Sequence, residues 1–192
     1  MAARRPQFRV WFAAALLLSC LLSCLAPIAA RAQAPAPMPI PNEVPGQDRR
    51  EPPIAPNHAE RIKQLARDGF YNNVPFHRVM DGFMAQTGDG KNFDGTGGSK
   101  YPNLKAEFSS VPFKRGIVGM ARRGDSVDTA NSQFFFMFAD GPSLNGQYTV
   151  IGEVVSGMDV VEKLKKAPPG SAGGSVTDPD KMVKVQVASD IK

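Results

Sequence analysis

The spacing of hydrophobic positions divides the chain into three segments. A largely apolar run extends from Val10 to Ala26, residues 33–55 show no alternating apolar pattern, and short apolar repeats between turn residues fill the remainder. Pro56 suits the first position of a helix, and apolar residues then recur at helical spacing until Gly69. This pattern predicts one amphipathic helix at the start of the third segment.

Six later segments combine apolar, β-branched and aromatic residues between turn residues, as strands do. They are Val74–Met80, Phe83–Thr87, Gly116–Ala121, Gln133–Ala139, Tyr148–Val155 and Met182–Ala188. In the last segment Val183, Val185 and Val187 alternate with polar residues, which predicts a half-buried strand. A second, short helix is expected over about Met158–Lys166. Six strands, two helices and frequent glycine turns predict a mainly antiparallel β-barrel or sandwich with helical caps.

The alternation of side chains in the first strand separates its two faces. Phe76, Arg78 and Met80 are expected on one face, with His77 and Val79 on the other. Because His77 would point away from Arg78, we expect it to be a structural residue.

The strand Gln133–Ala139 is apolar on both faces. One face carries Gln133, Phe135 and Met137, and the other carries Phe134, Phe136 and Phe138. Only one face can fill the interior of a barrel. Phe135 and Met137 therefore need either a second packed layer under a loop, which periodicity alone favours, or a ligand.

The first 32 residues have the pattern of an export signal. Three arginines precede the apolar run, and Ala30 and Ala32 supply small residues at the two positions that a signal peptidase reads. We expect a signal peptide over residues 1–32 and a mature chain that starts at Gln33. Two alternatives remain open: the run Val10–Ala30 is about one bilayer crossing and could stay as an anchor, and a repeated Leu-Leu-Ser-Cys sequence allows lipoprotein processing.

Both cysteines of the chain lie inside this signal. A chain cleaved after Ala32 has no disulfide, no thiol nucleophile and no thiolate metal site. Residues 33–55 contain seven prolines and are expected to form a disordered linker, which leaves the globular domain over residues 56–192. The short signal looks bacterial, so the predicted location is the periplasm, with membrane anchoring as the alternative.

The net charge does not indicate a nucleic-acid partner. The formal charge is +5, but four of the 23 Lys and Arg residues lie within the first 32 residues, which contain no acid. Removing that segment leaves 19 bases against 18 acids, so no basic footprint remains.

Metal, nucleotide and hydrolytic chemistry find little support in the sequence. His58 and His77 are the only histidines, and no second His, Cys or close carboxylate pair stands at metal-ligand spacing. The Gly95–Lys100 sequence has the wrong spacing for a phosphate loop and is interpreted as a tight turn. Ser132 lacks the glycine pattern of a nucleophile elbow. We therefore expect neither a metal nor a cofactor.

A block of separated motifs resembles a known family. Residues Phe76–Asp89, with the sequence FHRVMDGFMAQTGD, are similar to the signature of cyclophilin-type peptidyl-prolyl isomerases. Gly95–Gly98, Gly119–Ala121 and Asn131–Phe135 follow in the family's order and approximate spacing. The resemblance extends from about Ala55 to Ile191. It implies an eight-stranded antiparallel barrel capped by two helices, and an activity on X-Pro bonds that requires no cofactor.

The resemblance also implies roles for matching positions. Arg78 would be the catalytic guanidinium, and Gln86 and Gln133 would hold the substrate backbone or orient Arg78. The implied proline pocket and adjoining peptide groove consist of Phe83, Met84, Phe135, Leu144, Ala121 and the backbone of Arg122.

The sequence departs from the family pattern in four places, one of which, Asp81 for a common Pro, a turn tolerates. Tyr148 stands where many members have His, and it still offers an aromatic wall and a hydroxyl group. Ser143 replaces a Trp that contacts cyclosporin, which predicts weak cyclosporin binding. Residues 33–55 occupy the place of the family's first two strands, so we expect a barrel that lacks these strands, an exposed edge at Met182–Ala188 and lowered stability.

Two classes of function follow from this pattern. The first is a prolyl isomerase that assists the folding of exported polypeptides, with unfolded or Pro-containing chains as its partners. The second is a non-catalytic, cyclophilin-like module that binds Pro-containing segments. Neither requires nucleic acid, and a membrane partner is expected only if the signal is retained or lipidated.

Overall fold

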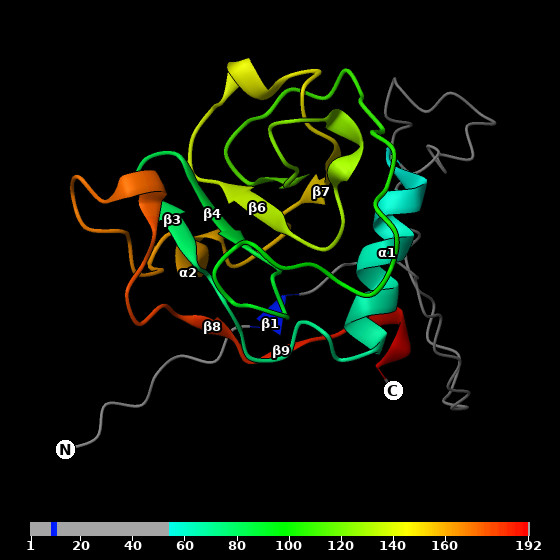
Figure 1. Cartoon of the computed structure of the whole chain (residues 1–192), viewed down its shortest axis with the longest axis horizontal. Coiled ribbons are helices and arrows are strands. Elements are labelled where there is room, and N and C mark those ends of the chain that lie inside the picture. The colour runs from blue at the N-terminus through cyan, green and yellow to red at the C-terminus, as the bar shows by residue number, and fades with distance from the viewer. Residues whose placement is uncertain (1–8, 11–53, 192) are drawn as a thin grey trace, which may run out of the picture. The chain divides into compact units, whose positions relative to one another are not determined.

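A computed structural model describes residues 9–10 and 54–191 of the chain. The expected signal peptide, apart from Arg9–Val10, and nearly all of the expected linker lie outside the described residues. Figure 1 shows the strands at the centre of the domain, with the helix α1 (Pro56–Arg67) beside them.

The helix α1 forms where the apolar spacing predicts it. Pro56 occupies its first turn, where a missing N–H costs no intrahelical hydrogen bond, and the helix ends at Arg67 just before Gly69. Ile62, Leu65 and Ala66 are buried on one face. These side chains join the main hydrophobic core, so the amphipathic pattern sets the orientation of the helix.

A carboxylate far along the chain caps the start of α1. The residue that precedes the helix, Ala55, offers no side-chain acceptor for the free N–H groups of the first turn. The carboxylate of Glu107 accepts the backbone N–H groups of Asn57 at 3.2 Å and His58 at 3.0 Å. The Nδ1 atom of the fully buried His58 lies 2.6 Å from Glu107 Oε2. This contact ties the helix to the loop that carries Glu107.

The central sheet has five antiparallel strands. Its order is β3-β4-β6-β5-β7, and two further pairs of strands, β2-β8 and β1-β9, lie outside it. The strands of the sheet are β3 (Arg78–Met80), β4 (Met84–Thr87), β5 (Ile117–Met120), β6 (Phe134–Met137) and β7 (Val150–Glu153). The predicted mainly antiparallel β fold with two helices is thus confirmed, with strands shorter than expected.

The two faces of β6 pack into different hydrophobic clusters. Phe134 and Phe136 belong to the main core, which also holds residues of both helices. Phe135 and Met137 belong to a second cluster with Phe113, whose ring stacks on that of Phe135 at 5.8 Å. The second packed layer expected for this face is therefore present.

The first expected strand, Val74–Met80, is divided in two. Val74–Pro75 (β2) pairs with Lys181–Met182 (β8), and the ladder resumes only at Arg78 in β3. Because Phe76 and His77 lie between the two strands, the strict alternation of side chains is lost there. Phe76 consequently packs in the main core with Val79, and the prediction that it shares a face with Arg78 is wrong.

The last expected strand, Met182–Ala188, is also interrupted. Val183 separates β8 from Lys184–Val185 (β9) and is 44% exposed, and Lys184 after it is also exposed, whereas Met182 before it is buried. The predicted alternation holds from Lys184 onward, because Val185 and Val187 are buried. It is wrong at Val183, which was expected on the same buried face.

The last expected segment has a strand partner on one side. The strand β8 pairs with β2, and β9 pairs in parallel with Arg9–Val10 (β1). Each pair is a two-stranded sheet, so among the described residues β8 and β9 keep a second edge without a strand partner, and the exposed edge stays a prediction.

The second helix, α2 (Met158–Val161), is shorter than expected. Two backbone N–H groups in the segment after α2 form hydrogen bonds with distant parts of the chain. Lys165 N–H donates to Asp180 Oδ2 at 2.8 Å, and Ala167 N–H donates to the carbonyl of Val79 at 2.9 Å.

We predict that Glu107→Gln lowers the free energy of unfolding by about 1–2 kcal/mol at pH 7, because a charged cap bonded to backbone N–H groups is lost. Burial raises the pKa of Glu107, but hydrogen bonds from His58 and Asn57 outweigh burial and hold that pKa below its usual value. A lowered pKa in the folded state stabilises the fold above the unfolded pKa, and this contribution disappears as pH falls through the folded value.

Denaturant unfolding of wild type and Glu107→Gln between pH 3 and pH 7 checks this prediction. The difference between the two proteins should shrink toward the acid end. Glu153→Gln serves as the control, because Glu153 lies exposed on β7. Equal unfolding free energies for Glu107→Gln and wild type at pH 7 would contradict the assigned cap.

Candidate active site

The antiparallel register of the sheet places four residues in one row. Arg78 of β3 lies opposite Gln86 of β4, Gln86 lies opposite Phe135 of β6, and Phe135 lies opposite Gly119 of β5. Directly opposed residues point to the same face of a sheet, so this row brings the cation, the amide and the aromatic ring together. A Cβ atom at Gly119 would lie 2.6 Å from the ring of Phe135, so the ring occupies space that only glycine leaves free.

A chain of hydrogen bonds fixes the polar side chains of this row. Arg78 Nη1 donates to Gln86 Oε1 at 3.1 Å, and Gln86 Nε2 donates to Gln133 Oε1 at 2.9 Å. Gln133 Nε2 then donates to the carbonyls of Gly95 and Gly97, both at 2.8 Å. Each donor in the chain determines which end of the next amide must accept, so both glutamine side chains have a defined orientation.

The guanidinium of Arg78 is also held from a second side. Its Nε donates to the carbonyl of Gly173 at 2.6 Å, in a short 3-10 helix, Ala172–Gly174, that packs against β3. The Nη2 atom lies 3.2 Å from the sulfur of Met80. An arginine carries five N–H donors in one plane, so these contacts fix the plane and leave donors for a substrate.

A pocket of about 170 Å³ adjoins this guanidinium, and we call it the apolar pocket because six of its nine lining residues are apolar or aromatic. It is lined by Arg78, Phe83, Met84, Gln86, Ala121, Arg122, Phe135, Leu144 and Tyr148. The structure thus brings together nine of the ten predicted site residues. The tenth, Gln133, touches this group through Gln86 and lines a neighbouring pocket.

Two aromatic contacts shape the wall of the apolar pocket. The rings of Phe135 and Tyr148 meet edge to face with their centroids 5.8 Å apart. The guanidinium of Arg122 lies 4.6 Å from the centre of the Tyr148 ring, and its Nε donates to the carbonyl of Gln147 at 3.1 Å. The resemblance implied a role for the Arg122 backbone alone, whereas its side chain supports the tyrosine.

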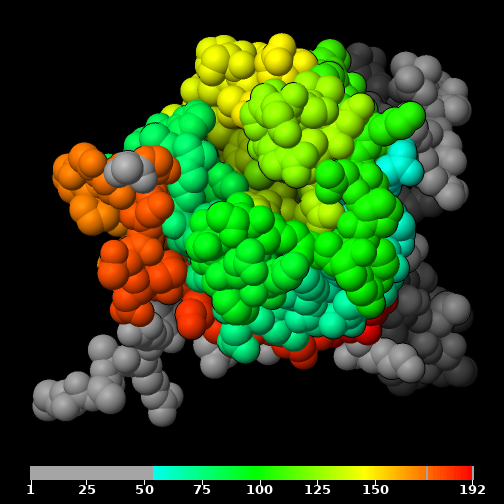
Figure 2. Space-filling view, in the orientation of Figure 1, coloured from blue at the N-terminus to red at the C-terminus, as the bar shows by residue number. Residues whose placement is uncertain are grey.

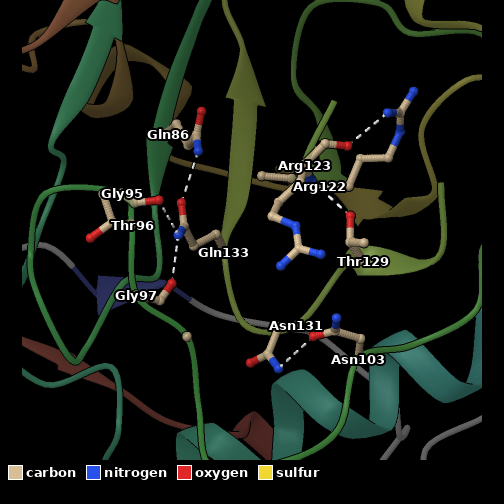
Figure 3. A pocket seen from close by; sticks show the side chains of 12 residues that line it. Gln86, Gly95, Thr96, Gly97, Asn103, Arg122, Arg123, Thr129, Asn131 and Gln133 are labelled. Carbon is tan, nitrogen blue, oxygen red and sulfur yellow. Dashed lines mark hydrogen bonds between the residues drawn. The ribbon is translucent and has the colours of Figure 1, made fainter. Parts of the chain in front are cut away.

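A second pocket of about 450 Å³ is lined mostly by polar residues and glycines and is called the polar pocket; it shares Gln86, Ala121 and Arg122 with the apolar one. Figure 2 shows this face of the molecule hollowed between the green loop 88–98 and the yellow-green segment 122–129. Its remaining lining residues, most of them labelled in Figure 3, are Gly95, Thr96, Gly97, Gly98, Asn103, Arg123, Thr129, Asn131 and Gln133. Sequence reasoning missed Arg123, Asn103 and Thr129, which stand in no recognised motif.

The loop that holds Gln133 is organised by a buried carboxylate. Asp89 is 0% exposed and accepts the backbone N–H groups of Lys91, Asn92, Gly95 and Gly97 at 2.9–3.0 Å. A Cβ atom at Gly97 would lie 2.3 Å from Asp89 Oδ1, so the loop can approach the carboxylate only with glycine there. The Gly95–Gly98 sequence is therefore part of a loop that presents the carbonyl groups of Gly95 and Gly97 to Gln133.

His77 lies outside both pockets. It is buried, and burial lowers its pKa, although the negative charges of Asp89 and Asp94 oppose that effect. A neutral, buried ring agrees with the structural role expected for it.

The described residues, 9–10 and 54–191, contain neither a metal cluster nor a membrane span. No group of three or more His, Cys, Asp or Glu side chains there is placed to bind a metal ion. No helix in that part of the chain combines the length and hydrophobicity needed to cross a bilayer.

The fold and the motifs match one protein family. The family model for the cyclophilin type peptidyl-prolyl cis-trans isomerase/CLD covers residues 51–187. A probable peptidyl-prolyl cis-trans isomerase of Brucella abortus is 56% identical over 151 residues, which span 73% of this chain and 76% of the relative. A peptidyl-prolyl cis-trans isomerase of Helicobacter pylori is 42% identical over 116 residues, which span 58% of this chain and 69% of the relative.

Solved structures agree with this match. Cyclophilin AquaCyp293 from Hirschia baltica superposes with a TM-score of 0.64 at 25% identity and covers 73% of this chain and 69% of its own. A cyclophilin type isomerase of Cryptosporidium parvum, crystallised in the presence of the dipeptide Ala-Pro, gives a TM-score of 0.56 at 27% identity, over 65% and 80% of the two chains. The chain belongs to the cyclophilin-type peptidyl-prolyl cis-trans isomerase family.

We predict that Asp89→Asn loosens the loop that anchors Gln133, because an amide NH₂ group would face backbone N–H donors. Burial raises the pKa of Asp89, but four backbone hydrogen bonds outweigh burial and keep it below its usual value, so the ionised form stabilises the loop at neutral pH. The expected loss is about 1–3 kcal/mol of unfolding free energy.

Hydrogen exchange at the amides of Lys91, Asn92, Gly95 and Gly97 reports on this loop directly. Exchange should accelerate in Asp89→Asn and stay unchanged in the control Asp94→Asn, whose carboxylate is exposed and, within the part of the chain that the structure describes, bonds to Thr96. Unchanged exchange in Asp89→Asn would show that the carboxylate does not organise the loop.

Proposed function

We propose that this chain accelerates rotation about X-Pro peptide bonds. The observation that carries the proposal is the guanidinium of Arg78, which two neighbours hold beside an apolar pocket. A proline ring is apolar and its imide nitrogen lies at the ring's edge. A ring seated in the pocket would therefore present that nitrogen close to the cation.

The reaction is slow without a catalyst because resonance gives the peptide C–N bond partial double-bond character, with a barrier of about 18–20 kcal/mol. The two planar forms of an X-Pro bond differ by only about 0.5–1 kcal/mol, so the obstacle is kinetic. At the twisted transition state the nitrogen regains its lone pair. A donor aimed at that nitrogen stabilises the transition state more than either planar form.

Arginine suits this task because it stays charged and presents its donors in a rigid plane. The contacts with Gly173 and Gln86 fix that plane before substrate arrives, so little reorganisation is needed at the moment of rotation. Phe135, Met84 and neighbouring apolar side chains would hold the ring and exclude water, which strengthens the charge interaction.

The remaining site residues would hold the peptide on the other side of the bond. Gln86 and Gln133 offer polar groups in fixed orientations, and Ala121 and Arg122 line both pockets. No covalent bond forms or breaks during the rotation, so the reaction calls for no nucleophile and no proton transfer.

We predict that Arg78→Ala lowers kcat/KM for a Pro-containing peptide by about 10²–10³-fold, the usual effect of removing one preorganised donor. Arg78→Lys should recover only part of the loss, because an ammonium group lacks the planar set of donors. A protease-free isomerisation assay measures both variants, with Arg67→Ala as an exposed control on α1.

Two results separate the classes of function. If wild type binds Pro-containing peptides without any rate above background, the chain is a binding module and the isomerase proposal fails. If Arg78→Ala keeps full activity, the activity stands but the role given to the guanidinium is wrong.

We also propose that the clients are exported polypeptides and that the chain works in the periplasm. The arginine-led apolar run and the small residues at Ala30 and Ala32 support export. A cut after Ala32 would remove β1, whose Arg9–Val10 pairs with β9. The mature protein would then keep the sheet and both pockets and lose one strand pair.

Mass measurement of the protein from periplasmic and membrane fractions tests this export. The expected result is a soluble chain that begins at Gln33. A full-length chain in the membrane fraction would support the anchor, and a lipid-modified cysteine would support lipoprotein processing. Recovery of the full-length chain from the cytoplasm would overturn the proposal.

A further inference from the structure

The polar pocket lies directly beside the apolar one, and the two share Gln86, Ala121 and Arg122. If the proposed function holds and a proline ring occupies the apolar pocket, the same peptide must pass next to the polar pocket. The residues that line the polar pocket therefore influence which peptides the site accepts.

The lining of the polar pocket carries two guanidinium groups and no carboxylate. The guanidinium of Arg122 is already engaged, because it stacks on Tyr148 and donates to the carbonyls of Gln147 and Arg123. The guanidinium of Arg123 extends into the pocket, as Figure 3 shows. Arg123 is therefore the cation that a ligand in this pocket would meet.

The position of Arg123 is set by its backbone. Its N–H donates to Thr129 Oγ1 at 2.9 Å, and that hydroxyl donates to the carbonyl of Ser126 at 2.9 Å. Among the described residues, the polar partner of its side chain is Asp125, whose Oδ1 lies 3.2 Å from Nε. Both side chains of this pair are about two-thirds exposed, at 69% and 65%, so water screens their attraction. The Nη groups can still donate to a second carboxylate, since an arginine carries five donors.

Peptide geometry indicates which substrate residue would reach Arg123. In an extended chain, successive side chains point to opposite sides and every second one points to the same side. With the proline ring directed into the apolar pocket, the neighbouring residue points away from the surface. The residue two positions from proline points back toward it and can enter the polar pocket.

We propose that Arg123 makes the site selective for an acidic side chain two residues from the proline. The substrate carboxylate binds the Nη edge of the guanidinium while Asp125 keeps the Nε edge. Gln133 and the glycine loop form the opposite wall of the pocket. This inference rests on the proposed function, because it assumes the proline ring in the apolar pocket.

Matched peptides test the proposal. Peptides with Glu or the isosteric Gln two residues before proline, and a second pair with the change two residues after it, are assayed for isomerisation by wild type and Arg123→Ala. Wild type should prefer Glu over Gln by about two- to fivefold in kcat/KM in one of the pairs, as an exposed ion pair allows. Arg123→Ala should turn over Glu and Gln peptides equally.

Two further measurements sharpen this result. Arg123→Glu should invert the preference, so that a Lys peptide is turned over faster than the Glu peptide. Raising the salt from about 0.05 M to about 1 M should abolish the wild-type preference, because the Debye length falls to about 3 Å. The control variant Arg115→Ala replaces an exposed arginine that lines neither pocket, and it should keep the preference for Glu over Gln.

The outcomes distinguish the inference from the proposed function. Turnover with no difference between Glu and Gln in either pair overturns the inference and leaves the isomerase intact. A preference that persists in Arg123→Ala also overturns it. If no peptide is turned over, the proposed function fails, and equilibrium binding of the same peptides by titration calorimetry decides the charge preference.

Discussion

The position of the Arg78 guanidinium depends on hydrogen bonds with its neighbours. Much of the surrounding structure holds those neighbours in place. An unrestrained arginine on a three-residue strand would sample many rotamers. Here Gln86 and the carbonyl of Gly173 hold it, Gln133 holds Gln86, and the loop around Asp89 holds Gln133. The rigidity of this series of hydrogen bonds depends on the group at its end, which is the loop around Asp89. The buried carboxylate that collects four backbone N–H groups is therefore as much a part of the site as the groups that line it.

The two-sided packing of β6 couples this site to the stability of the domain. Phe134 and Phe136 fill the main core, while Phe135, one residue from each of them, forms a pocket wall on the opposite face. Because alternate residues of one strand serve the core and the pocket, a shift in register would disturb both. Phe113 stacks under Phe135 and makes that wall a rigid surface.

Much of the site could be predicted because its residues stand in short, ordered motifs. The family resemblance alone groups Arg78, Gln86 and Phe135 into one site, and the antiparallel register places them in one row. The prediction failed where a local irregularity broke the alternation, as at Phe76 between β2 and β3. Arg123 was missed because nothing in its immediate sequence marks it, and only the folded loop extends it into a pocket.

The sequence alone determined the helix from Pro56 and the antiparallel strands, since these follow from local spacing and residue type. The residues of the site were implied by the motifs that resemble the family. Tertiary structure decided which distant groups meet. The cap of α1 by Glu107 joins segments some fifty residues apart, and no periodicity records that contact. The pairing of Arg9–Val10 with β9 and the junction of the two pockets have the same origin. These contacts form only when segments far apart in the sequence are brought together, and that is a property of the whole fold.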